Sequence, residues 1–504
     1  MKRILLASAS AVALFAAPAM AQDIGNQSTV SQTGDSNQAS VDQTGGTAGV
    51  VNATQTGDGH SLTVNQSDVN GAGSGSTAND AEVTQENTNR TVPGLGSSAT
   101  ITQESDNASA DANLVTLKQR TDGDAPAQTA SIGQSGSGNT VNASMGTTSN
   151  PANGDLQNGQ QLSVSQTGQG NTSLSTQVGA QSSINVLQSG DSNNSSVDQA
   201  GNAGGAIANV SQFGTGNGST VYQDSGNNVA HTTANVTQDG TSNTSDVTQV
   251  AASADTVVNQ SGTSNDSSVS QTLKAYNGQV NVSQSGAGNN VSKVTQKDSD
   301  LSAPPYESSL SAKVVQNGDH NDSTVSQDAT GAIADVEQDD SGQKSEVIQT
   351  GDNSNAVVRQ SNARNYSSVN QGPGTSDAYV SQIGTDNQSY VTQAGSSAAT
   401  TVNGDYAVHV VQAGANGFST IAQNADNNSA DVTQEAGSNL ASSTILQNGT
   451  GGTVLVDQGG TGNLSTVNQN SGDGNVASVF QTATDGNVST INQAGNGNTA
   501  TVNQ

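Results

Sequence analysis

The twelve residues from Gln493 to Gln504 read QAGNGNTATVNQ. Asn498, Ala500, Val502 and Gln504 are two residues apart, so on an extended strand their side chains point to one face. The Thr and Asn residues between them then face water. The preceding residues are rich in Gly and Asn, which supply positive φ angles and turn hydrogen bonds. We interpret this stretch as a tight turn followed by a short strand.

The same unit recurs through the chain at a fixed spacing. Eight successive glutamines from Gln316 to Gln393 are eleven residues apart, and Val or Ile lies two residues before nearly every such Gln. One unit reads Asn-x-(Ala/Ser)-x-Val-x-Gln-x-Gly-x-x. The side chains predicted to point inward include Asn26, Val30, Gln32, Asn37, Val41, Gln43, Gln166, Asn171, Gln188, Asn193, Gln260, Asn265, Gln316, Asn321, Gln382, Asn387, Gln493, Asn498, Val502 and Gln504. The glycines predicted to form the turns are Gly34, Gly168, Gly190, Gly262, Gly318, Gly384 and Gly495.

Two such units, folded back to back, make a rung of about 22 residues. Rungs stacked at ~4.8 Å let every backbone amide pair with the rungs above and below. An unpaired buried amide costs roughly 1–3 kcal/mol, but stacked identical carboxamides can satisfy one another. The period therefore predicts an all-β fold: a β-solenoid with an amyloid-like two-sheet core and ladders of Gln and Asn.

The composition alone favours disorder, because only 30% of the residues are hydrophobic, 2% are aromatic and none is Cys. The regular period favours an ordered fold instead. The formal net charge is −30. We therefore expect no binding to nucleic acid, which requires a cationic surface.

Residues 1–21 have the pattern of a signal peptide: Lys2 and Arg3 precede an apolar run, and Ala19 and Ala21 fit the cleavage rule, with Gln22 as the first mature residue. We expect secretion without membrane insertion. Residues 22–504 form the predicted repeat domain. The repeat is less regular over 67–161, where Met145 lies at a position due a Gln, and insertions are predicted at 297–313 and 394–411.

The sequence contains no pattern of catalytic or metal-binding residues. His60, His231, His320 and His409 lie far apart, so we expect them at solvated turn or flank positions. We predict no enzyme activity, no cofactor and no specific metal site. The Asp-rich turns near Gly57 and Glu337 leave weak Ca²⁺ binding as an alternative.

The unit Gln-x-Gly-x-x-Asn-x-Ala-x-x-x-Gln resembles the curlin repeat of bacterial curli fibre subunits. QTGDSNQASVDQ (Gln32 to Gln43) and QAGNGNTATVNQ match it at every fixed position. The resemblance implies an extracellular amyloid fibre that scaffolds biofilm and mediates adhesion to host or abiotic surfaces. It also implies three partners: further copies of the chain, a nucleator subunit and an outer-membrane secretion channel.

The repeats at both ends look uncapped, so we expect head-to-tail stacking into a filament. Outward Asp residues should slow this stacking, and screening or protonation should speed it, at higher salt or below about pH 4. The alternative is a non-polymerising solenoid: an adhesin, or an ice- or surface-binding protein that uses its outward Thr and Ser rows.

Overall fold

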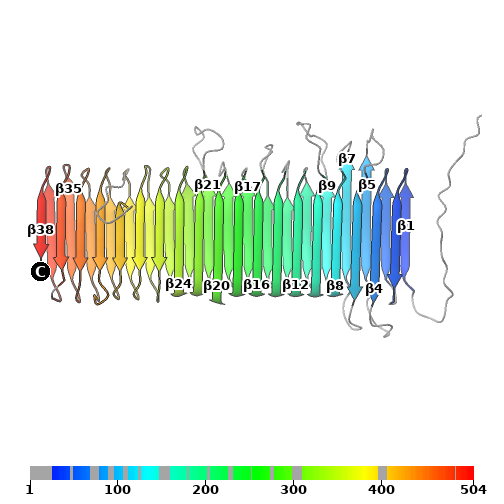
Figure 1. Ribbon diagram of the computed structural model, residues 1–504, viewed down its shortest axis with the longest axis horizontal. Coiled ribbons are helices and arrows are strands. Elements are labelled where there is room, and N and C mark those ends of the chain that lie inside the picture. The colour runs from blue at the N-terminus through cyan, green and yellow to red at the C-terminus, as the bar shows by residue number, and fades with distance from the viewer. Residues whose placement is uncertain are drawn as a thin grey trace, which may run out of the picture.

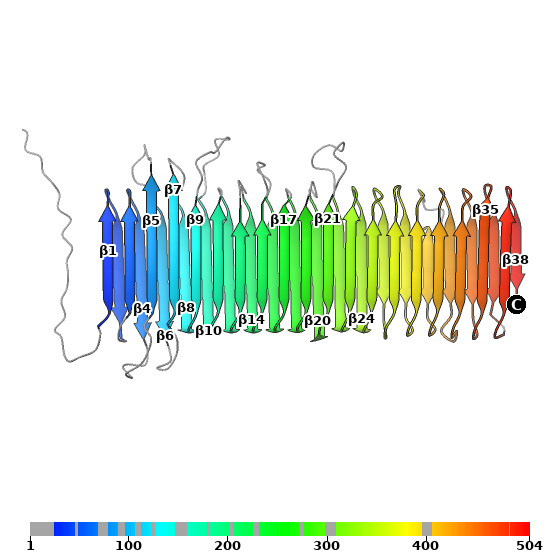
Figure 2. The same cartoon turned by 180° about the vertical axis from the view of Figure 1, so that it is seen from behind.

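The computed structural model describes residues 25–504 apart from 46–48, 69–78, 89–95, 106–111, 123–126, 147–158, 179–180, 201–204, 225–230, 251–252, 273–276, 298–308, 396–405 and 483. These residues form 38 strands and no helix. The strands stand side by side in a long slab, whose first and last strands lie at opposite ends (Figures 1 and 2). The predicted all-β class is confirmed.

The odd-numbered strands form one sheet, called sheet A, and the even-numbered strands form a second, called sheet B. Sheet A contains β1 (Gln27–Thr33), β3 (Val50–Thr56), β5 (Asp80–Thr88), β7 (Leu114–Asp122), β9 (Thr140–Gly146), β11 (Thr172–Val178), β13 (Asn194–Gln199), β15 (Gly218–Gln223), β17 (Thr244–Val250), β19 (Asp266–Thr272), β21 (Val291–Lys297), β23 (Asp322–Asp328), β25 (Lys344–Gln349), β27 (Tyr366–Gln371), β29 (Gln388–Gln393), β31 (Phe418–Gln423), β33 (Ser442–Gln447), β35 (Leu464–Ser471) and β37 (Val488–Ala494). Sheet B contains β2 (Gln38–Thr44), β4 (Ser61–Asp68), β6 (Ser98–Ser105), β8 (Thr129–Ser137), β10 (Gln161–Gln169), β12 (Ser183–Asp191), β14 (Ile207–Thr215), β16 (Thr233–Thr241), β18 (Asp255–Thr263), β20 (Gln279–Gly288), β22 (Ser311–Asp319), β24 (Ile333–Ser341), β26 (Asn355–Gln360), β28 (Asp377–Gln382), β30 (Val408–Gln412), β32 (Ser429–Gln434), β34 (Thr453–Gln458), β36 (Val476–Gln481) and β38 (Thr499–Asn503).

Each strand pairs in parallel with the strands two places before and after it, except that the first and last strands of each sheet have one partner. An odd strand and the following even strand thus make one rung of the predicted β-solenoid. The pairing places like residues opposite one another: Gln55 faces Gln85 in sheet A, and Val258 faces Val282 in sheet B. Register is set in this way because a slip by one residue would turn every inward side chain outward.

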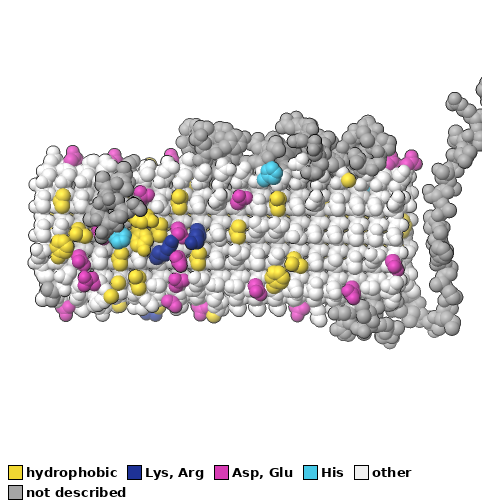
Figure 3. Space-filling model, viewed as in Figure 1, with side chains coloured by type: hydrophobic (Ala, Val, Ile, Leu, Met, Phe, Trp, Pro, Cys, Tyr) yellow, Lys and Arg dark blue, Asp and Glu magenta, His cyan; other side chains and the backbone are white. Residues whose placement is uncertain are grey.

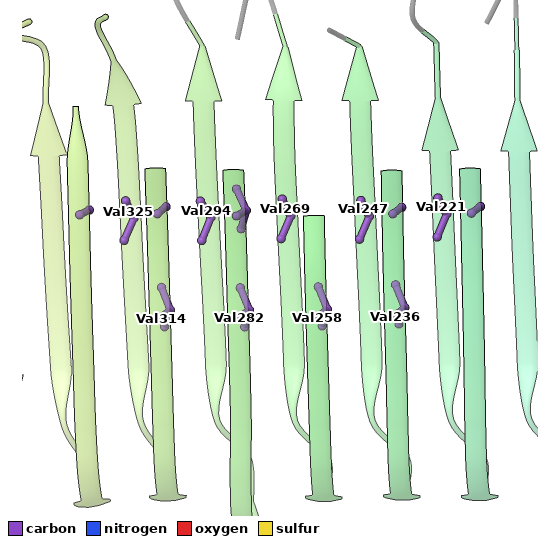
Figure 4. Close-up of a cluster of buried hydrophobic side chains, with 14 of the residues drawn as sticks. Val221, Val236, Val247, Val258, Val269, Val282, Val294, Val314 and Val325 are labelled. Carbon is purple, nitrogen blue, oxygen red and sulfur yellow. The ribbon is translucent and has the colours of Figure 1, made fainter. Parts of the chain in front are cut away.

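The apolar core is a layer of mostly Val and Ala side chains, with some Ile and Leu, between the two sheets. In the middle of the slab, Val247 and Val269 project from sheet A toward Val258 and Val282 of sheet B (Figure 4). These valines are at most 1% exposed. The β-branched side chain suits a buried pleated surface, and repetition gives a core that ordinary composition could not supply.

The less regular range 67–161 contains the strands β5 to β9, which keep their register with their neighbours. Strand β22 begins at Ser311 and β30 at Val408, within the two ranges predicted as insertions. Most of the intervening residues lie outside the described part of the chain. The predicted signal peptide, with Ala19, Ala21 and Gln22, also lies outside it.

Candidate functional site

The most distinctive feature of the interior is a pair of Gln ladders, one in each sheet. In sheet B, each Gln donates a hydrogen bond from Nε2 to Oε1 of the Gln in the next rung. The Gln260 to Gln284 bond is 2.8 Å long, and the last one, from Gln481 to Gln504, is 2.9 Å. A second bond runs from Gln260 Nε2 to the carbonyl oxygen of Thr244, at 2.7 Å. The buried amides are thereby satisfied, as the sequence predicts.

The Gln ladder of sheet A is interrupted once. It runs from Gln32 to Gln119, whose Nε2 lies 3.7 Å from Sδ of Met145 on β9. The ladder resumes at Gln177, which donates to Gln199 at 3.2 Å. Because the side chain of Met145 has no N–H to donate, Oε1 of Gln177 is buried without a hydrogen-bond partner. The sequence had identified Met145 as the irregular position.

A ladder of Asn side chains runs along the turns. In it, each bond between two Asn side chains is donated to the preceding rung, whereas the Gln ladders donate to the next rung. Asn193 donates back to Oδ1 of Asn171 in the preceding rung, through its side chain at 3.1 Å and its backbone N–H at 3.0 Å. Asn171 also donates from Nδ2 to the carbonyl oxygen of Gly190 in the next rung, at 2.7 Å. Asn171, which also donates to Oδ1 of Asn139, therefore joins three successive turns.

Five of the predicted turn glycines accept such a hydrogen bond from the side chain of an Asn in the preceding rung: Gly168, Gly190, Gly262, Gly318 and Gly384. Gly168 and Gly190 both have φ near +110°, and a Cβ at Gly168 would overlap the carbonyl oxygen of Gly190. Positive φ is also found at Gly34, Gly262, Gly318 and Gly495. Gly384 also lies in a turn, but it does not adopt positive φ. Its constraint is close approach, because a Cβ there would overlap the carbonyl oxygen of Gly414.

The two sheets differ at the inward position two residues before the Val. From β11 onward, sheet A has Ser at that position, whereas β3 to β9 have Val or Ala. The hydroxyls of Ser245 and Ser267, for example, are buried without a hydrogen-bond partner. Sheet B mostly has Ala or another apolar residue, such as Ala234. The eleven-residue unit read from the sequence averages the two. An alignment at 22 residues would have separated them.

The predicted inward residues differ in burial according to their distance from the ends of the slab. Those at most 2% exposed are Gln166, Asn171, Gln188, Asn193, Gln260, Asn265, Gln316, Asn321, Gln382 and Asn387, and Gln493 is 5% exposed. Those partly buried are Asn37, Val41, Gln43, Asn498 and Val502. Those exposed are Asn26, Val30, Gln32 and Gln504. The last two groups belong to the first and last rungs, where only one side is covered by another described rung.

One of the four histidines, His60, does not lie at a solvated position, so that prediction was wrong for it. His60 replaces Asn in the turn of sheet B and is fully buried; its Nδ1 accepts a hydrogen bond from the backbone N–H of Ser97, at 3.1 Å. His409 lies on β30, 3.1 Å from the carboxylate of Asp431. His231 and His320 are exposed, as expected.

The outer faces carry charges that are unevenly distributed. In Figure 3, the visible Lys and Arg side chains gather in the half of the slab nearer β38. Arg364 forms an ion pair of 2.7 Å with Asp386, one rung further along, and lowers the pKa of that carboxyl group. Partial burial and the nearby Asp224 instead raise the pKa of Asp198.

A similar acidic group lies on sheet B. Partial burial, Glu435 and Asp431 raise the pKa of Asp457. Such carboxylates repel one another across neighbouring rungs, and they lose their charge at a higher pH than an ordinary Asp.

Among the described residues, no three His, Asp or Glu side chains are grouped so as to hold a metal ion. The same part of the chain has no helix long and apolar enough to cross a membrane.

Fold and interior together define a class of protein: a parallel two-sheet β-solenoid whose interior is lined by hydrogen-bonded amides. No family model matches the chain, and no curated protein is significantly similar to it.

Proposed function

We propose that this protein is the secreted structural subunit of an extracellular, curli-like amyloid fibre, in which copies stack end to end. One observation carries the proposal: the first and last rungs have matching inward side chains in both sheets. In sheet A, Asn26, Ser28, Val30 and Gln32 of the first rung correspond to Asn487, Ser489, Ile491 and Gln493 of the last. In sheet B, Asn37, Ala39, Val41 and Gln43 correspond to Asn498, Ala500, Val502 and Gln504.

The direction of the ladders supports the same joint. Gln504 would donate from Nε2 to Oε1 of Gln43 in the next copy, as Gln481 donates to Gln504 within the chain at 2.9 Å. The backbone N–H of Asn37 in that copy would donate to Oδ1 of Asn498, as His60 donates to Asn37 at 2.9 Å. Different surfaces meet at this joint, and each added copy continues the straight axis of the slab (Figure 1), so repetition gives an open filament rather than a closed ring.

The curlin resemblance supplies the biological part of the proposal. The fibre would form part of a biofilm matrix and hold cells to host or abiotic surfaces. A signal peptide, passage through the periplasm, an outer-membrane channel and a nucleator subunit complete the route. No catalytic step is included.

A second candidate is a non-polymerising solenoid that binds a surface, such as ice, or acts as an adhesin. It is favoured by uncharged rows on the outer face of sheet B, where Thr63, Thr100, Ser131 and Ser163 lie opposite one another in successive strands. A single copy of the chain presents these rows without any assembly.

Filament length distinguishes the two candidates. Amyloid dyes and the ~4.8 Å reflection do not, because the folded monomer already contains two stacked parallel sheets. Electron microscopy and sedimentation of the purified mature protein should reveal filaments much longer than one slab. A protein that stays monomeric would favour the surface-binding solenoid.

A matched pair of variants tests the joint itself. Val30 is 43% exposed at the open face of the first rung, so Val30→Lys should leave the monomer folded and stop elongation. Thr29→Lys adds the same charge to the outer face of the same strand and should elongate as wild type does. Equal elongation by both variants would contradict the proposed joint.

Salt and acid test the role of the negative charge. Higher salt, or a pH below about 4, should shorten the lag before filaments form, because repulsion between copies is screened or removed. The raised pKa of Asp198 and of Asp457 moves part of this neutralisation to higher pH. Equal lag times under all conditions would exclude charge as a brake on assembly.

A further inference from the structure

Four of the seven tyrosines form two close pairs on the outer faces, within residues 366–406. Tyr366 on β27 and Tyr390 on β29 belong to neighbouring strands of sheet A, with ring centroids 5.3 Å apart and an interplanar angle of 46°. Tyr379 on β28 and Tyr406, just before β30, have centroids 5.4 Å apart and an angle of 39°. At these separations the rings are in van der Waals contact.

Each of these tyrosines has a single phenolic neighbour among the described residues. The other neighbour of Tyr390 is Phe418, at 5.8 Å, which has no hydroxyl group. The other neighbour of Tyr379 is His409, which stacks on it at 5.2 Å and an angle of 17°. Hydrogen-bonded strands hold Tyr366, Tyr379 and Tyr390 in place, and Tyr406 lies two residues before β30, so the same two rings meet in every folded copy.

We propose that these two pairs are sites of oxidative cross-linking, in which each pair becomes a dityrosine. A haem peroxidase with hydrogen peroxide is the class of oxidant required. Each phenol gives up one electron and one proton, and the two phenoxyl radicals join through ring carbons ortho to their hydroxyls. Tautomerisation returns the ortho hydrogens to the oxygens and restores both phenols. The two electrons and two protons released convert one hydrogen peroxide to two waters.

The bonds would link rungs that are otherwise held without covalent cross-links. The chain has no Cys, so it cannot use disulfides for this purpose. The bond between Tyr366 and Tyr390 ties β27 to β29, and the bond between Tyr379 and Tyr406 ties β28 to the start of β30. A link of this kind limits the freedom of the unfolded chain, as a disulfide does. The inference is independent of fibre formation, because both partners of each pair lie in one copy.

The test treats dilute, full-length protein with a haem peroxidase and hydrogen peroxide, and then maps cross-linked peptides by mass spectrometry. We expect dityrosine fluorescence and two linked peptide pairs, each lighter by two hydrogen atoms than the sum of its parts. Tyr390→Phe should lose the first pair and keep the second, and Tyr406→Phe should do the reverse. The control Tyr222→Phe, six strands away from β27 within sheet A, should keep both.

Two further measurements keep the test decisive. Circular dichroism should show that the Phe variants, which retain the ring, are folded. The same treatment in denaturant should scatter the links among many tyrosine pairs. The proposal fails if folded protein yields neither pair, or if the yield rises with protein concentration as expected for links between copies.

Discussion

The Gln ladders of the two sheets differ in one position, and that difference shows what the ladder contributes. In sheet B, every described rung from Gln43 to Gln504 is joined to the next. In sheet A, Met145 interrupts the ladder, and Oε1 of Gln177 is left without a donor. Yet β9 and β11 remain paired in register across this break. Backbone pairing and the valine layer thus hold the rungs together, and the amides add stability locally.

A charge placed in the unbroken Gln ladder of sheet B should cause the largest loss of local stability. Gln260→Glu keeps the shape but places a carboxylate against Oε1 of Gln284 and the carbonyl oxygen of Thr244, which were bonded to Nε2. We expect a local loss of about 3–5 kcal/mol at pH 7, because an unpaired buried charge is strongly unfavourable. Hydrogen exchange of β18 and β20 is the suitable measurement, since long repeat arrays do not unfold in a single step.

The pH dependence of this variant follows from the sign of its pKa shift. Burial raises the pKa of the new Glu in the folded state above its unfolded value of about 4.3. The destabilisation should therefore be large at pH 7, shrink as the pH falls and be smallest below about 4, where both states are protonated. Gln161→Glu, at an exposed position on β10, is the control and should change little. A loss that persists in acid would mean that shape, not charge, is responsible.

A smaller loss of stability should follow when the interruption that Met145 causes in sheet A is reproduced in sheet B. Gln260→Met has a side chain of similar length but donates nothing, so Gln284 would resemble Gln177 in losing its donor. We expect a loss of about 1–3 kcal/mol in the protection of β18 and β20, the cost of an unsatisfied buried amide. Protection equal to that of the wild type would show that the ladder contributes nothing beyond packing.

Much of the interior could be predicted from the two-residue alternation of side chains on a strand and from the eleven-residue spacing of Gln. The eleven-residue interval fixed which side chains point inward, and it identified Met145 as a defect. It also contained a signal for His60 that was missed, because His60 lies six residues before Gln66, where other units have Asn. The opposite directions of the Gln and Asn ladders could not be predicted, because either amide can donate forward or backward. Only the fixed position of the turn carbonyls, such as that of Gly190, selects one direction.

A Gln at position 145, which completes the Gln ladder of sheet A, should stabilise that sheet. In Met145→Gln, the new amide can accept from Gln119 and donate to Gln177, which fills the gap between them. We expect a gain of about 1 kcal/mol in the protection of β9 and β11, the net value of a typical hydrogen bond. The control Met145→Leu conserves apolar volume and should give no gain. If both variants behave alike, the gain reflects packing.

The smallest change in stability should come from replacing the buried serines that distinguish sheet A from sheet B. The hydroxyl of Ser267 is buried without a partner, so Ser267→Ala removes a desolvated polar group and breaks no hydrogen bond. We expect protection of β19 to stay equal or to rise by up to about 1 kcal/mol. The reverse exchange, Ala234→Ser, should lower the protection of β16 by a similar amount. A clear loss in Ser267→Ala would mean that the hydroxyl is hydrogen-bonded in solution, for example to an internal water, and that the serine side of sheet A is a stabilising polar row rather than a tolerated one.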